Sequence, residues 1–203
     1  KGDITVNGGA IDVASTSSFQ WDGSRTLTVN NGGRATFNNS FYTPTGATVN
    51  VSGTNSKVET PGNAYFRIIN GAQVNVTDGG ALASGWFLDI GIAGNGTLVA
   101  DGTNSSVNAG FGTCFWGASG NTASVTFRNG ATCQAGLILA VSDNTNGTNA
   151  TVSVESGAHL AVGSGGLGGL YINNAGGTTS GSVTVTGAGS EITHAAGSSL
   201  TVG

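Results

Sequence analysis

The sequence predicts an all-β protein: a single-domain right-handed parallel β-helix, or β-solenoid, of about eight turns with three short strands per turn. Three observations lead to this prediction. Apolar residues recur in pairs two positions apart, which is the alternation of a half-buried strand. These pairs return every 22 to 31 residues along the whole of residues 1–203, a spacing typical of solenoid repeats. The 37 glycines and the many β-branched residues disfavour helix throughout.

The first strand of each expected turn is marked by its apolar pair, as in Ile4 with Val6. The turns start near Ile4, Leu27, Val49, Val74, Leu98, Val125, Val152 and Val183. A glycine turn and a second, shorter strand follow, as in VNVSGTNSKV (Val49–Val58). Because Gly, Asn and Asp accept left-handed backbone angles at little cost, these segments predict sharp corners.

A third strand closes each expected turn, again with two core positions two residues apart. We align these positions as Phe19/Trp21, Phe41/Thr43, Phe66/Ile68, Leu88/Ile90, Cys114/Trp116, Leu139/Val141, Leu170/Ile172 and Leu200/Val202. Stacking like residues over like would bury continuous ladders of apolar side chains, although no single turn has a core of its own.

Composition limits the partners of this chain. A net charge of −4 with only six Lys and Arg argues against nucleic acid. No run of about 18 apolar residues occurs, so we expect no membrane insertion of this segment. The low charge and the polar, uncharged surface favour a secreted, extracellular protein.

The motif Leu88-Asp89-Ile90-Gly91, followed by Asn95-Gly96-Thr97-Leu98, recurs in similar form at Gly181–Ser190 and Leu200–Gly203. In this pattern the chain resembles the β-helix repeats of autotransporter passengers and PEP-CTERM-associated surface proteins of bacteria. The resemblance covers most of the chain and weakens in the N-terminal third, where Phe19–Trp21 and Phe41–Thr43 depart from it. It implies export to the bacterial cell surface and a role in adhesion or aggregation, and it supplies no catalytic residues.

We therefore expect a non-catalytic structural β-solenoid, acting in adhesion or aggregation, or as an extracellular filament built by end-to-end stacking of turns. Unpaired strand edges need a neighbour. Ile4 and Val6 at one end and Leu200 and Val202 at the other would meet either neighbouring repeats of the same chain or identical subunits stacked head to tail. Surface glycans or other cells are further expected partners. The alternative is a tailspike-like module that binds or degrades polysaccharide.

Few side chains point to chemistry. Most of the ten carboxylates fall at expected corners, and Asp89 is expected to form a surface ion pair with Arg67. We expect no catalytic residues, no cofactor and no metal site, since His159 and His194 lack partners at ligand spacing.

Two further groups of side chains remain. Tyr42, Phe115 and Tyr171 are expected to face outward on the third strands and to offer an interaction surface. Cys114 and Cys133 are expected at core positions about one turn apart, either as buried small hydrophobes or, alternatively, as a disulfide.

Overall fold

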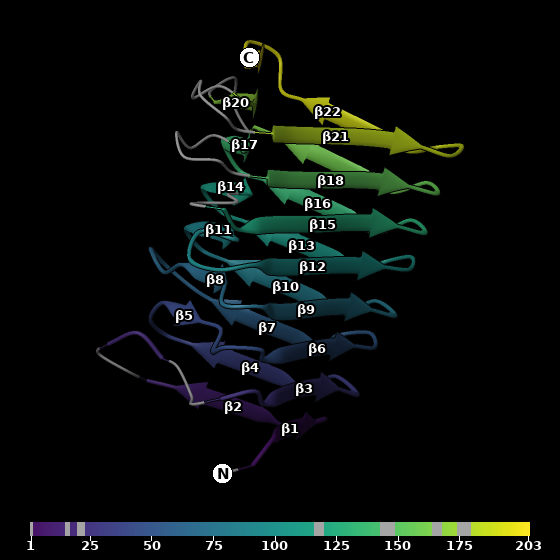
Figure 1. The fold of residues 1–203 in the computed structure, drawn as a ribbon. Helices are drawn as coiled ribbons and strands as arrows, with labels where there is room; N and C mark the ends of the chain where they lie inside the picture. Colours follow the sequence, from purple (N-terminus) through teal and green to yellow (C-terminus); the bar gives the residue numbers. More distant parts are fainter. Residues whose placement is uncertain are drawn as a thin grey trace.

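A computed structural model confirms the all-β parallel β-solenoid (Figure 1). The structure describes residues 2–14, 17–19, 23–115, 120–142, 149–163, 168–173 and 180–203, with 113–115 described by their backbone alone. Within these ranges the chain forms strands and no helix. The chain climbs from β1 to β23, and each turn lies on the one before it (Figure 1).

Three parallel sheets form the sides of the solenoid. Sheet A contains β1 (Ile4–Asn7), β3 (Thr26–Asn30), β6 (Thr48–Ser52), β9 (Ala72–Thr77), β12 (Gly96–Asp101), β15 (Thr122–Arg128), β18 (Asn149–Glu155) and β21 (Ser180–Thr186). Sheet B contains β2 (Ala10–Val13), β4 (Arg34–Phe37), β7 (Lys57–Thr60), β10 (Ala81–Ser84), β13 (Ser106–Ala109), β16 (Thr132–Ala135), β19 (His159–Val162) and β22 (Glu191–His194). Sheet C contains β5 (Phe41–Tyr42), β8 (Phe66–Ile68), β11 (Phe87–Ile90), β14 (Gly112–Phe115), β17 (Ile138–Val141), β20 (Gly169–Ile172) and β23 (Ser199–Val202).

The number of complete turns is slightly lower than the eight expected. The first turn contributes β1 and β2, but it reaches sheet C only through an isolated bridge between Phe19 and Phe41. Of the remaining turns, six are covered by a neighbour on both sides. The pairing of β5 with β8 is also the shortest in sheet C, so this sheet is least regular near the N-terminal end.

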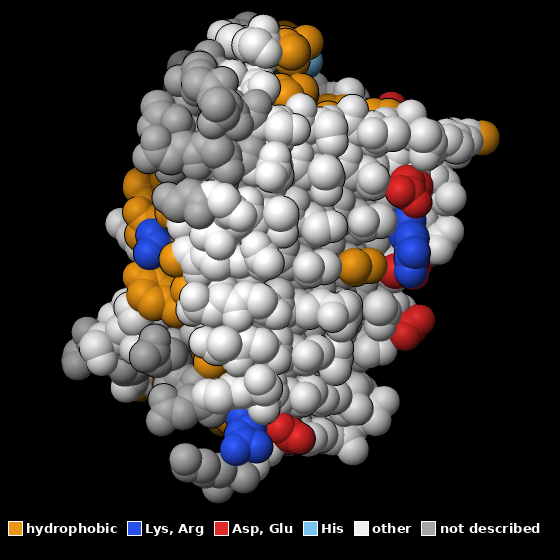
Figure 2. All heavy atoms as spheres, in the orientation of Figure 1, with side chains coloured by type: hydrophobic (Ala, Val, Ile, Leu, Met, Phe, Trp, Pro, Cys, Tyr) orange, Lys and Arg blue, Asp and Glu red, His pale blue; other side chains and the backbone are white. Residues whose placement is uncertain are grey.

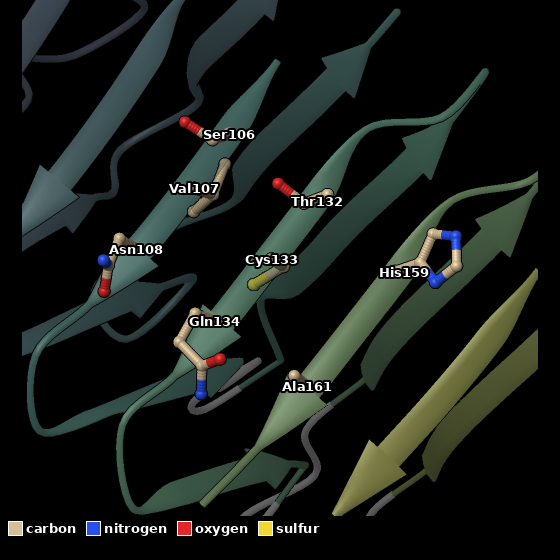
Figure 3. A pocket seen from close by; sticks show the side chains of 8 residues that line it. All are labelled: Ser106, Val107, Asn108, Thr132, Cys133, Gln134, His159 and Ala161. Carbon is tan, nitrogen blue, oxygen red and sulfur yellow. The ribbon is translucent and has the colours of Figure 1, made fainter. Parts of the chain in front are cut away.

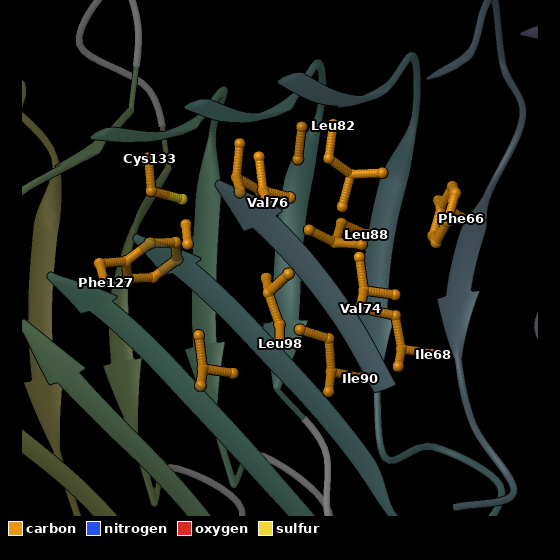
Figure 4. Close-up of a cluster of buried hydrophobic side chains, with 14 of the residues drawn as sticks. Phe66, Ile68, Val74, Val76, Leu82, Leu88, Ile90, Leu98, Phe127 and Cys133 are labelled. Carbon is orange, nitrogen blue, oxygen red and sulfur yellow. The ribbon is translucent and has the colours of Figure 1, made fainter. Parts of the chain in front are cut away.

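The predicted register of sheet A is confirmed. Ile4 pairs with Leu27, Leu98 pairs with Val74 and Val125, and Val152 pairs with Val183. Each of these residues therefore lies above its counterpart in the previous turn. The resulting ladders fill the interior with aliphatic side chains and a few Phe rings (Figure 4). Fully burying one such side chain contributes about 1.5–3 kcal/mol, so stacking supplies the core that one turn lacks.

In β14 the predicted register is wrong by one residue. The backbone pairs Thr113 with Leu88 and Leu139, and it pairs Phe115 with Ile90 and Val141. The backbone of Phe115 therefore takes the register of the core residues Ile90 and Val141, and not the outward register predicted for it. Cys114 pairs instead with Asp89 and Ala140, while Trp116, like Trp21, lies outside the described residues. The cause is the corner before the strand.

The corner between sheets B and C is two residues long in three successive turns, at 85–86, 110–111 and 136–137. This constant length fixes where β14 begins, whereas the alignment by hydrophobicity ignored it. Glycine is required here because a Cβ added at Gly110 would lie 2.5 Å from the carbonyl oxygen of Gly85 in the turn below. Only a residue without a side chain allows such a close approach.

The three corners differ in length. Between sheets A and B the corner has three or four residues from β3 onward, and Asn or Asp with a positive φ stands in most of them, as in Asn55 (φ 66°) and Asn104 (φ 68°). Between sheets C and A the corner lengthens along the chain, from three residues after β8 to seven after β17 and β20. The variation in repeat length therefore arises mainly beside sheet C.

Candidate functional site

The last turn exposes the apolar ladders of the solenoid. Val185 on β21 is 45% exposed, and Leu200 and Val202 on β23 are 59% and 67% exposed. The residues they stack on are better covered, since Val154 is fully buried, Leu170 is 6% exposed and Ile172 is partly buried. These positions repeat the core register with nothing above them.

At the opposite end the predicted stacking residues are better covered. Ile4 is partly buried against the core, and Val6 is only 7% exposed. Of the four residues predicted to mediate end stacking, Leu200 and Val202 are therefore the ones whose apolar surface faces outward.

The outer face of sheet A is polar and mostly uncharged. Its outward rows consist largely of Thr, Ser and Asn, and Asn75 donates a hydrogen bond of 2.9 Å to Asn50 in the turn below. Figure 2 shows few charged side chains on this face, most of them near the edge that leads to sheet B. A surface of this kind is well solvated.

A second surface feature lies on sheet C and on the corner that leads into it. Arg67 on β8 points its guanidinium at two tyrosine rings, with Cζ 4.9 Å from the ring centre of Tyr42 and 4.6 Å from that of Tyr65. Its Nε donates to Oδ2 of Asp89 on β11 at 2.9 Å. Three contacts therefore hold one cation in place.

Three more aromatic rings continue this feature along the solenoid. Trp86 stacks on Phe111 in the next turn with ring centres 4.4 Å apart, and Phe87 lies 4.9 Å from Phe111. Phe87 also stacks on Tyr65 at 5.9 Å, which joins the two halves. We call this set the aromatic cluster: Tyr42, Tyr65, Trp86, Phe87 and Phe111, with Arg67 and Asp89 between them. Orange side chains on both sides of a blue one mark the edge formed by sheet C in Figure 2.

The structure separates the three residues predicted to form an interaction surface. Tyr42 belongs to the aromatic cluster, Phe115 takes a core register, and Tyr171 lies on the same outward row as Tyr42 with β8, β11, β14 and β17 between them. Strand alternation did not point to Tyr65, Trp86, Phe87 and Phe111. Their signal is an aromatic residue at or just after the corner in successive repeats, as in Gly85-Trp86-Phe87 and Gly110-Phe111.

Asp89 pairs with Arg67 as predicted, but it is not a surface residue. Its side chain is 4% exposed, against 27% for Arg67. Burial raises the pKa of Asp89 above its ordinary value, and the hydrogen bond and charge of Arg67 offset only part of that rise. Removing Arg67 would leave a buried carboxylate without its counter-ion.

Two further carboxylates also make contacts between turns. Glu59 accepts from Arg34 in the neighbouring turn and lies 2.6 Å from Nζ of Lys57 on its own strand. Burial raises the pKa of Glu59, but these two cations outweigh it and hold the pKa below its ordinary value. Asp101 accepts from Asn129 at 2.7 Å and from Arg128 at 2.8 Å, and these contacts lower its pKa.

A shallow hollow of about 350 Å³ lies on sheet B (Figure 3). Ser106, Val107, Asn108, Thr132, Cys133, Gln134, His159 and Ala161 line it. The expectation that His159 lacks an acidic partner is wrong, because its Nδ1 lies 2.7 Å from Oε1 of Glu191. The two residues are 32 positions apart in sequence but adjacent in register. Among the described residues, no group of three or more His, Cys, Asp or Glu is placed to hold a metal ion.

Cys133 is a free, buried cysteine on β16. Of the two alternatives, Cys133 is therefore the small buried hydrophobic residue, and the disulfide with Cys114 is not formed. Burial raises the pKa of the Cys133 thiol far above its ordinary value, so it stays protonated and unreactive in the folded protein.

Comparison with known proteins yields no relative: no family model, no curated protein and no solved structure matches this chain. Within the described part of the chain, no helix is long and apolar enough to cross a bilayer. The interpretation of the candidate sites therefore rests on their geometry alone.

Proposed function

We propose that this chain is a structural, non-catalytic β-solenoid segment of a secreted or surface-displayed bacterial protein, acting in adhesion, aggregation or filament formation. In this role the end of the solenoid is covered by further turns of the same kind, from the same polypeptide or from an identical subunit. The low charge, the polar face of sheet A and the resemblance to autotransporter passenger repeats support the location.

The observation that carries the proposal is the exposed end of the ladders. Val185, Leu200 and Val202 continue the core rows, and each is about half exposed or more. Covering the three with a further turn contributes about 3 kcal/mol by apolar burial alone. The open edges of β21, β22 and β23 would also gain backbone hydrogen bonds to the added turn.

The ion pairs made by three carboxylates support the proposal that the chain is non-catalytic. Polysaccharide hydrolysis needs two carboxyl groups that converge on one bond. In this chain Glu59, Asp89 and Asp101 are each held by an arginine, namely Arg34, Arg67 and Arg128, in a contact that joins neighbouring turns. Such contacts stabilise the stack and leave these groups little freedom to transfer protons.

Two measurements test the structural role. Sedimentation of the chain over a range of concentrations reports association of identical units, and a variant with Leu200→Lys and Val202→Lys serves as the control. A fusion of a second copy of residues 174–203 after Gly203 adds one turn to the same chain. We expect either concentration-dependent rods that the control abolishes or a higher melting temperature in the fusion. If neither occurs, the exposed end is not a stacking surface and the proposal is wrong.

A further inference from the structure

The aromatic cluster is not needed to fill the core beneath it. Phe41, Phe66 and Leu88 fill the interior of the same turns and are fully buried. Tyr42, Tyr65, Trp86, Phe87 and Phe111 lie outside that core and remain partly exposed. Rings that pack on one another at the surface of an otherwise polar solenoid mark an interaction site.

The centre of the aromatic cluster carries no net charge. Arg67 and Asp89 neutralise each other through the contact at 2.9 Å. The guanidinium has five N–H donors, and this contact uses Nε, so the two NH₂ groups stay next to the rings of Tyr42 and Tyr65. The cluster thus combines aromatic surface with fixed, neutral hydrogen-bonding groups.

The size of the aromatic cluster limits its partner. It follows the solenoid axis from β5 to β14, three strand spacings or about 14 Å, and it is one corner wide. A stable protein interface needs about 800 Å² from each partner, which is far more than this strip provides. A narrow, linear ligand fits the shape better.

We propose that the aromatic cluster binds a neutral polysaccharide laid along the solenoid axis. A sugar ring has an apolar C–H face, which packs on the exposed aromatic surface of Trp86 and Phe87. Its hydroxyl groups exchange hydrogen bonds with Arg67 and with the tyrosine hydroxyls. The neutral Arg67–Asp89 pair gives no preference for a charged chain.

Affinity electrophoresis of the whole chain tests this proposal. The native gels contain a neutral β-glucan, polygalacturonate or no polysaccharide. We expect the β-glucan alone to retard the wild-type protein, and Trp86→Ala to weaken the retardation on the order of tenfold. Tyr171→Ala is the matched control, since Tyr171 lies on the same row of sheet C away from the cluster, and it should be retarded as the wild type is. Circular dichroism checks folding, and Tyr42→Ala replaces Trp86→Ala if the latter unfolds.

The variant Asp89→Asn provides a readout that a purely structural role would not change. It leaves the charge of Arg67 uncompensated, so the protein should gain retardation in polygalacturonate. Absence of retardation by the β-glucan, equal loss in Tyr171→Ala, or retardation of the wild type by polygalacturonate alone would each overturn the proposal. Because the substituted residues lie away from β21–β23, loss of polysaccharide binding and loss of end-to-end association are separate outcomes.

Discussion

Replacing Arg67 by Ala should destabilise the fold by about 3 kcal/mol. Removing one partner of a buried ion pair costs about 3–5 kcal/mol because the other charge is left buried and unpaired. Arg67 is 27% exposed, so solvent screening reduces the cost of leaving the Asp89 carboxylate unpaired to about 2 kcal/mol. Loss of the contacts with the rings of Tyr42 and Tyr65 adds about 1 kcal/mol.

Urea unfolding followed by circular dichroism measures this cost, and the double variant Arg67→Ala/Asp89→Asn isolates its cause. With no buried charge left, the double variant should lose only about 1 kcal/mol. The pH dependence has a definite sign. Without Arg67 the folded-state pKa of Asp89 rises further above its unfolded value, so stability falls as the pH rises through that window and returns on acidification. A double variant as unstable as Arg67→Ala, or a single variant that costs under about 1 kcal/mol, would refute the reasoning.

Two other predictions concern the interior. Phe127→Ala should lower the free energy of unfolding in urea by about 3–5 kcal/mol, because Phe127 is fully buried and its loss leaves a cavity. Thr126→Ala, on the outward face of the same strand, should change it by no more than about 0.5 kcal/mol. Equal effects of the two variants would mean that the stacked apolar side chains do not stabilise the fold. The Cys133 thiol should resist a maleimide reagent in the native protein and react quickly in urea, as mass spectrometry would detect; rapid native labelling would contradict its burial.

The sequence was sufficient to predict the register of sheet A and the presence of a short second strand after the glycine turn. Val49, Val74 and Leu98 are spaced so that only one stacking register keeps every apolar side chain inside. The prediction did not hold in β14, where Thr113 occupies a core register and the two-residue corner, not hydrophobicity, sets the alignment with Leu88.

The candidate sites were harder to predict, because they arise from contacts between turns. The pair Arg67–Asp89 was predicted by aligning repeats, but the burial of Asp89 was not. Alignment reveals which residues are adjacent and leaves open what covers them. His159 and Glu191 were missed although the same alignment places them side by side, since they are distant in sequence. Trp86 lies in a corner, where strand alternation says nothing about the direction of a side chain.

The unequal corners make this solenoid tolerant of insertion on one side. Segments between sheets C and A range from three to seven residues, yet the paired rows of sheet A keep one register from β1 to β21. Doubling the length of a loop adds only about 0.6 kcal/mol of closure entropy. Foreign peptides grafted into this corner in successive turns should therefore be displayed at regular intervals of about 4.8 Å along the solenoid axis.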